Sequence, residues 1–168
     1  GLLIKDGRAI EELNNVDTVL FDKTGTLTNE EPEVGRIIIA DNDYNTNDIL
    51  TYAATAEHKL THPLAKAIIK KAQEFNLELP SIEDSEFKMG FGISVKIDKQ
   101  LIRVGSARFM KMENLQIPGI IQTTLESSQL EGHSLVLLAV DSAVIGAIEI
   151  EAILRPEVKS VLSGLRKR

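Results

Sequence analysis

Residues 16–28 read VDTVLFDKTGTLT, and this stretch decides the fold class. Its first half, residues 16–21, is apolar and rich in β-branched side chains, which predicts a buried parallel strand. Asp22 follows at the carboxyl end of that strand, where open α/β sheets hold their ligands. The glycine and the threonines that come next can offer backbone N–H groups and hydroxyls to a phosphate. The stretch therefore predicts covalent phosphoryl chemistry with Asp22 as the nucleophile.

The heptapeptide at residues 22–28, DKTGTLT, resembles the phosphorylation motif of the P-type ATPases, the cation pumps that pass through an aspartyl phosphate. The alternative for this segment alone is an acidic turn after a core strand, with its threonines capping a helix. The resemblance implies that Asp22, Lys23 and Thr24 carry catalysis, with Lys23 and Thr24 positioning or neutralising the phosphate. It also implies ATP as the substrate and Mg²⁺ as the metal, held by an Asp22 oxygen and the Thr24 carbonyl.

Composition limits the kinds of partner. A chain of 168 residues suggests one or two domains, and its net charge of −6 argues against nucleic acid or an anionic membrane surface as a partner. It has no cysteine, and its three histidines show no metal-ligand spacing, so no transition-metal site is predicted. No run approaches the roughly 18 apolar residues of a membrane span. Since a pump must cross a membrane, we expect a soluble piece at the cytoplasmic face, whose partners are the remaining phosphorylation, actuator and transmembrane domains of a parent pump.

The order of the expected elements predicts an α/β protein with an α+β insert. This order is similar to the layout of the P-type pumps. The resemblance implies that residues 1–29 begin a Rossmann-like phosphorylation domain of the haloacid-dehalogenase type, that residues 30–146 form a nucleotide-binding domain, and that residues 147–168 return to the first domain incompletely. In the insert, an antiparallel sheet with flanking helices is expected from the alternating apolar pattern and the turn residues. The expected strands are residues 34–40, 87–89, 93–97, 101–104, 135–140 and 143–150. The expected helices are residues 8–13, one capped at Asn47, one starting at Pro63, then 106–113, 120–130 and 157–165.

A second motif lies inside the insert, where residues 57–65 read EHKLTHPLA. It resembles the ExxxxHPLA segment of the heavy-metal-transporting branch of the P-type ATPases. By this resemblance Glu57 and His62 contact the adenine of ATP, since an imidazole can stack on a purine while a carboxylate accepts from its exocyclic amine. The alternative for His62 alone is an N-cap before a helix that starts with proline.

Three short signals extend the expected nucleotide site. Gly90 and Gly92 form the GxG of the branch, which lets a ligand approach the backbone closely, although a bulge or turn is the alternative. The branch usually shows Val-Gly-Asn where this chain has Gly105 and Ser106, so Ser106 is either a ligand contact with shorter reach or a helix N-cap. The family often has Asp where this chain has Ala152.

Two other functions remain open. A phosphatase of the haloacid-dehalogenase superfamily would place its nucleophile at the same strand end, but it commonly carries a second Asp two residues later, where this chain has Thr24. A nucleotide-binding module without turnover is the other alternative, because the family's GDGxND loop and its TGES segment do not occur in this sequence. We therefore expect this chain to bind ATP weakly and to turn it over poorly or not at all, whereas the parent would be an ATP-driven pump for a heavy-metal ion.

Overall fold

A six-stranded antiparallel sheet forms the centre of the computed structural model, which describes residues 3–4, 6–88 and 91–167. Its strands lie in the order β1-β6-β5-β4-β3-β2. Their bounds are Glu33–Ile39 (β1), Asp84–Lys88 (β2), Gly92–Ile97 (β3), Gln100–Gly105 (β4), Ser134–Val140 (β5) and Ala143–Glu151 (β6). The expected antiparallel sheet is confirmed, and every expected strand of the insert lies within or beside an observed one.

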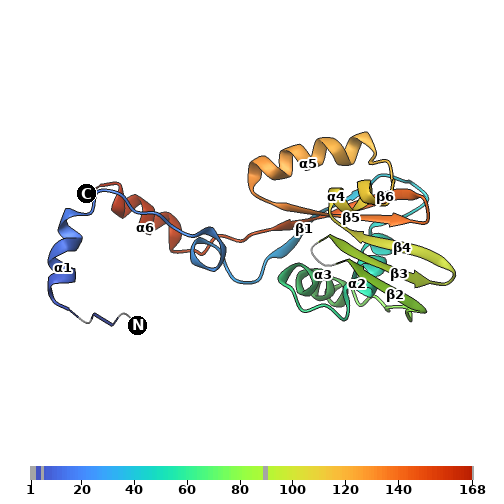
Figure 1. The fold of residues 1–168 in the computed structure, drawn as a ribbon, viewed down its shortest axis with the longest axis horizontal. Helices are drawn as coiled ribbons and strands as arrows, with labels where there is room; N and C mark the ends of the chain where they lie inside the picture. Colours follow the sequence, from blue (N-terminus) through green and yellow to red (C-terminus); the bar gives the residue numbers. More distant parts are fainter. Residues whose placement is uncertain (1–2, 5, 89–90, 168) are drawn as a thin grey trace.

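Helices cover both faces of the sheet (Figure 1). On one face lie α2 (Thr46–Glu57) and α3 (Pro63–Glu74), and on the other lie α4 (Ala107–Met112) and α5 (Gly119–Glu131). The alternation of side chains along β5 divides the core, because Val136 and Leu138 pack toward α2 and α3 while Leu137 and Ala139 pack toward α4 and α5. This two-sided burial explains why β5 is almost continuously apolar.

Local sequence sets the start of α2, although not at the residue expected. Asn45, rather than Asn47, is the N-cap. Its side chain accepts the backbone N–H groups of Asn47 and Asp48, at 2.8 and 3.2 Å. Asp48 in turn accepts the backbone N–H of Asn45 at 2.8 Å, which completes a capping box. The prediction was two residues late. Asn47 has no carboxylate three residues later that could accept its backbone N–H, whereas Asn45 has Asp48 in that position.

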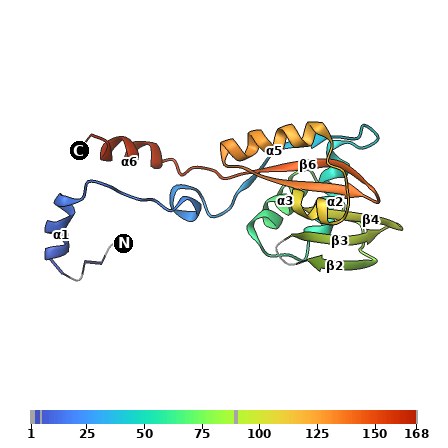
Figure 2. The ribbon, with the colours of Figure 1, turned by 45° about the horizontal axis from the view of Figure 1, so that its top comes forward.

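An arm extends from one end of the sheet (Figures 1 and 2). It consists of α1 (Arg8–Glu12), the motif segment 16–28 and α6 (Val158–Leu165). The strand predicted for residues 16–21 is wrong: these residues are exposed and extended without strand pairing, and Leu20 is 93% exposed. A strand needs backbone partners on a neighbour. None of the described strands pairs with this segment.

Two further observations concern the boundary of the insert and the exposure of β3. β6 continues from Ala143 to Glu151, so the sheet extends five residues past the expected boundary at residue 146; the division into domains stays a prediction. Ser94, expected on a solvated face of β3, is only 9% exposed. No helix in the described ranges is both long and apolar enough to cross a bilayer.

Candidate functional site

A cavity of about 890 Å³ lies where the sheet meets the arm. Its walls come from the motif segment, the start of α3, the β3–β4 pair with the start of α4, the end of α5, and the start of β5 with the end of β6. Of the predicted site residues it brings together Lys23, Glu57, His62, Gly92, Gly105 and Ser106. Ala152, where the family often has Asp, also lines the cavity. Gly90 lies outside the described residues.

Glu57 and His62 meet at the start of α3. His62 is the N-cap of this helix, and its Nδ1 accepts the backbone N–H of Ala65 at 3.2 Å. That bond leaves the ring proton on Nε2, which lies 3.0 Å from Glu57 Oε2. The two atoms are close but not aligned as a hydrogen bond, so Glu57 Oε2 is a buried oxygen without a hydrogen-bond partner among the described residues. The N-cap interpretation of His62 is confirmed, and its ring also faces the cavity.

Burial shifts both titrating groups toward their neutral forms. Glu57 is only 5% exposed, and burial raises its pKa to about 7. The pKa of His62 is lowered, also by burial. A tight ion pair would lower the pKa of the acid and raise that of the base, so these directions show that burial outweighs the attraction between the two groups. The buried Oε2 of this carboxyl lacks a hydrogen-bond partner among the described residues, and the carboxyl titrates near neutral pH. Such an oxygen is suited to accept a hydrogen bond from a donor group of a ligand.

Gly92 and Gly105 have a packing reason to be glycine. They pair across β3 and β4. A Cβ on Gly105 would lie 2.5 Å from the Phe91 carbonyl and 2.7 Å from the Phe109 ring, and one on Gly92 would overlap the same ring. Any larger residue would push β3, β4 and α4 apart, whether or not a ligand also approaches this backbone.

Ser106 is the N-cap of α4, so that alternative is confirmed. Its Oγ accepts the backbone N–H of Phe109 at 3.2 Å and donates to the Phe91 carbonyl at 3.3 Å. The backbone N–H of Ser106 donates to the same carbonyl at 3.0 Å. The hydroxyl is therefore committed to fixing Phe91 against the first turn of α4, and its contact with a ligand stays a prediction.

The phosphorylation motif forms a single wide helical turn at Lys23–Leu27. The turn is closed by the backbone N–H of Thr28, which donates to the carbonyl of Lys23 at 3.0 Å. Gly25 has φ +78°, a left-handed conformation that favours glycine. Asp22 precedes the turn, is exposed, and makes no capping hydrogen bond with it. The Lys23 ammonium lies 3.4 Å from the carbonyl of Gly132, at the end of α5.

Arg155 holds this turn in place, a contact that the sequence alone did not indicate. Its guanidinium donates to the carbonyls of Gly25 and Thr28, at 3.0 and 3.2 Å. The backbone N–H of Arg155 also donates to Leu27 at 3.0 Å, and Asn29 donates to Ile153 at 2.8 Å. The return segment after β6 therefore binds the backbone of the motif, and the carboxylate of Asp22 stays exposed.

Mg²⁺, the cation that the family resemblance implies, fits the donors at the motif. Asp22 supplies exposed carboxylate oxygens that the turn does not use, and a backbone carbonyl at Thr24 would add a second hard oxygen, the donor type that Mg²⁺ prefers. When bound there, the ion would screen the repulsion between the carboxylate and a phosphate.

Phe91 and Arg108 are cavity residues that the sequence analysis did not single out. The Arg108 guanidinium lies 4.8 Å from the centre of the Phe91 ring, a cation–π distance. The two residues are far apart in the sequence and meet only because β3 pairs with β4. The one signal in the sequence was an arginine directly after the small residues 105–107.

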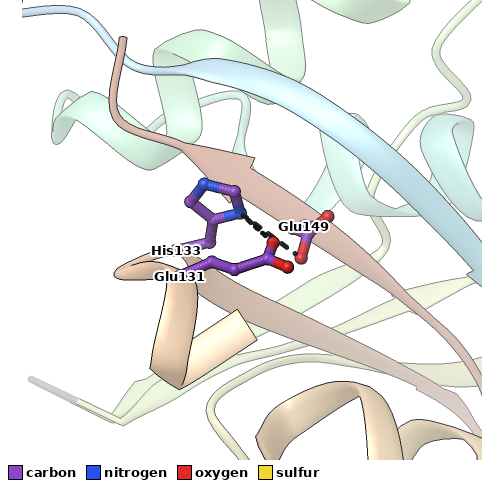
Figure 3. A group of neighbouring side chains, drawn as sticks. All are labelled: Glu131, His133 and Glu149. Carbon is purple, nitrogen blue, oxygen red and sulfur yellow. Dashed lines mark ion pairs between the residues drawn. The ribbon is translucent and has the colours of Figure 1, made fainter. Parts of the chain in front are cut away.

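A second polar group, also unforeseen, lies beside the cavity at the end of α5 (Figure 3). His133 Nδ1 lies 3.5 Å from an oxygen of Glu131 and 3.5 Å from one of Glu149. These donor atoms lie within 4.8 Å of one another, a spacing that a metal ion could bridge. However, both Glu149 oxygens already accept from the Arg36 guanidinium, at 2.7 and 2.9 Å, and Ser128 also donates to Glu149 at 2.5 Å. We therefore interpret the group as an ion-pair network that ties α5 to β1 and β6.

Removing Glu149 should destabilise the fold. Its carboxylate is 1% exposed, and the bond with Arg36 lowers its pKa to about 2. We expect Glu149→Ala to lower the free energy of unfolding by about 2 kcal/mol, because Ser128 is left buried without an acceptor, while the Arg36 side chain is half exposed and can rehydrate. Denaturant unfolding at pH 7 measures the change.

The exposed partner Glu131 provides the matched control, since Glu131→Ala should change stability by less than about 0.5 kcal/mol. In the unchanged chain the stabilisation from Glu149 is present above the ordinary carboxyl pKa and is lost as the pH falls toward 2. Equal effects of the two substitutions would show that the network does not hold α5.

Comparison with known proteins identifies the class. The family model described as haloacid dehalogenase-like hydrolase matches residues 16–168. The chain belongs to this family of hydrolases.

Its relatives within the class are metal-exporting pumps. The chain is 33% identical over 166 residues to a manganese-exporting P-type ATPase of Mycobacterium tuberculosis, covering 99% of this chain and 23% of that protein. It is 34% identical, with the same coverage, to a zinc-exporting P-type ATPase of Mycobacterium marinum. A crystal structure of a zinc-transporting PIB-type ATPase in the E2.Pi state superposes with a TM-score of 0.78 at 32% identity, covering 98% of this chain and 26% of that one. The chain thus spans about a quarter of its relatives' length, and the resemblance to heavy-metal P-type ATPases is confirmed.

Proposed function

We propose that this chain is the ATP-binding part of a heavy-metal P-type ATPase and that Asp22 accepts the terminal phosphate of ATP. One observation carries the proposal: a single cavity is lined by Glu57 and His62 at one place and by Lys23, the neighbour of Asp22, at another. Its volume of about 890 Å³ falls within the range of small-molecule sites. A nucleotide in it would have its base and its phosphates near different motifs.

At the base end, His62 and Glu57 supply a ring and an acceptor. The imidazole can stack on the purine, and Glu57 Oε2, which lacks a partner, can accept the exocyclic amine. His62 stays fixed through its bond with Ala65, so the ring is oriented before a ligand arrives.

At the phosphate end, the attacking atom is a carboxylate oxygen of Asp22. It would form a bond with the terminal phosphorus while the bond to the β-phosphate oxygen breaks and ADP leaves. The ammonium of Lys23 would neutralise part of the phosphate charge. Thr24 stands where related phosphatases commonly carry a second carboxylate, so this chain offers no general base there to hydrolyse the product. The acyl phosphate would persist until another part of the pump acts on it.

The wider context is part of the same proposal. The parent would be an integral membrane pump for a heavy-metal cation, with this part at the cytoplasmic face and with further phosphorylation, actuator and transmembrane domains as its partners. A nucleotide-binding module without turnover is the second candidate for the chain by itself, which the exposed, unpaired segment 16–21 before Asp22 favours.

Titration of the chain with ATP, followed by NMR or calorimetry, tests the base end. We expect His62→Asn to weaken ATP binding about tenfold, since loss of stacking on a base is worth about 1–3 kcal/mol. Asn is used because it keeps an acceptor for the N-cap bond, so α3 remains capped. His62→Ala should give the same loss of binding together with a loss of stability.

Two control variants define the outcome. His58→Asn, at an exposed histidine of the same loop, should leave ATP affinity unchanged, and so should Asp22→Ala. Unchanged affinity in His62→Asn would show that the base does not bind at this histidine.

A further inference from the structure

We propose that Arg108, held against the ring of Phe91, binds the phosphate chain of the nucleotide. The inference rests on the proposed function and adds a phosphate contact between the base end and Asp22. Neither motif of the sequence includes Arg108. The basic side chains that face the cavity single it out.

Four basic side chains line the described part of the cavity, and three of them lie within 3.5 Å of an oxygen of the protein. His62 caps α3 and lies against Glu57. His133 lies between two carboxylates. The ammonium of Lys23 lies 3.4 Å from the Gly132 carbonyl, beside the phosphorylation motif itself. Arg108 is the fourth.

Arg108 has no carboxylate partner among the described residues. Its contact is with the face of Phe91, 4.8 Å from guanidinium carbon to ring centre. Stacking on a ring restrains the guanidinium without using its N–H groups, so the five donors remain available to an anion. A restrained guanidinium of this kind suits phosphate, which it can bind through two parallel hydrogen bonds.

The position of Phe91 is itself fixed. Its carbonyl accepts both the backbone N–H and the hydroxyl of Ser106, at 3.0 and 3.3 Å. Ser106 also starts α4, the helix that carries Arg108 in its first turn. The ring and the guanidinium are therefore both positioned by the same cap.

This arrangement gives Ser106 a role that does not require its short side chain to touch the nucleotide. In this chain the serine positions Phe91, and Phe91 positions the arginine that faces the cavity. Arg108 is here a binding residue for phosphate groups, and Phe91 is a positioning residue that acts through it.

The test compares ligands that share a base and differ in phosphate number. The chain is titrated with adenosine, AMP, ADP and ATP, in the presence of Mg²⁺, before and after Arg108→Gln. We expect ATP affinity to fall about tenfold, because the arginine sits at an exposed site, where a charge-assisted hydrogen bond is at its weakest. Adenosine affinity should stay within about twofold.

Lys111 provides a matched control. It is exposed on the same helix and does not line the cavity, so Lys111→Gln removes the same charge and should leave all four affinities unchanged. Phe91→Leu keeps the guanidinium but removes its platform, and ATP affinity should fall about threefold, in line with about 0.5–1 kcal/mol for a cation–π contact. Circular dichroism and amide NMR spectra of each variant check that the sheet is intact.

Four outcomes would overturn the assignment. An equal loss for adenosine and ATP in Arg108→Gln would mean that Arg108 shapes the cavity and does not bind phosphate. An equal loss in Lys111→Gln would mean that only the general field of the domain matters. If the unchanged chain binds neither adenosine nor ATP, the proposed function itself fails. Adenosine binding that persists while the Arg108 effect is missing refutes only the phosphate contact.

Discussion

Phosphate from terminally labelled ATP should become covalently attached to the intact parent pump, and Asp22→Asn should abolish the labelling. Asparagine keeps the size of the side chain but removes the nucleophilic carboxylate, so the yield of phosphoenzyme should fall at least about a thousandfold. The bond formed is an acyl phosphate, which is stable in acid and cleaved by hydroxylamine. Acid quench of the labelled pump, with and without hydroxylamine, measures it.

Asp17→Asn is the matched control for this experiment. Asp17 lies on the same exposed segment, five residues before the motif, and no described contact joins it to the turn at Lys23–Leu27. Its substitution should leave labelling intact. Labelling that survives Asp22→Asn, or that is lost equally in both variants, would show that the acceptor is another residue.

The same label on the isolated chain should be weak or undetectable. In the structure, residues 16–21 lead to Asp22 as an exposed, unpaired segment. Among the described residues, Asp22 is therefore supported only on the side of the turn, through the bonds of Arg155 to Gly25 and Thr28. Strong labelling of the chain alone would mean that this one-sided support is sufficient.

Much of the insert could be predicted from sequence because its signals are local. A proline at the start of α3 and a glycine with φ +76° at the end of α5 each act within one turn of chain. The alternation along β3 similarly indicated which side chains face the core, apart from Ser94. These features need no knowledge of the rest of the fold.

The failures have a common physical cause, which is dependence on distant partners. The apolar run at 16–21 has the composition of a buried strand, yet a strand forms only where another strand supplies hydrogen bonds. Glu149 and Arg36 meet only because β6 lies beside β1. Phe91, just before β3, meets Arg108, just after β4, because these two strands pair with each other. Composition gives the tendency of a segment, and sheet order decides what it contacts.

The base end of the site offers the second large effect, and it concerns stability as well as binding. Burial raises the pKa of Glu57 from the usual 4.5 to about 7. Between these two values the folded chain keeps a proton that the unfolded chain has lost, so stability falls as the pH rises through this window. The stabilisation is complete below pH 4.5 and is lost above about pH 7, and the full difference amounts to about 3 kcal/mol.

Glu57→Gln should remove this dependence, because an amide does not titrate. We expect the variant to be about 2 kcal/mol more stable than the native chain at pH 8 and to match it more closely at pH 5, as measured by denaturant unfolding at both values. Glu78→Gln, at an exposed glutamate beyond α3, should alter neither the stability nor its pH dependence. A native stability that does not change between pH 5 and pH 8 would contradict the raised pKa.

The gain in stability should be accompanied by a loss of function, since the ionised carboxylate is the stronger acceptor for the adenine amine. ATP affinity of the native chain should therefore rise from pH 6 to pH 8, in the direction opposite to its stability, while the affinity of Glu57→Gln should be lower and independent of pH over this range. Adenosine should show the same trend as ATP, because the effect lies at the base. An affinity that falls with rising pH would show that the neutral form of Glu57 binds the nucleotide, and Glu57 would then act as a donor to a ring nitrogen instead of an acceptor from the amine.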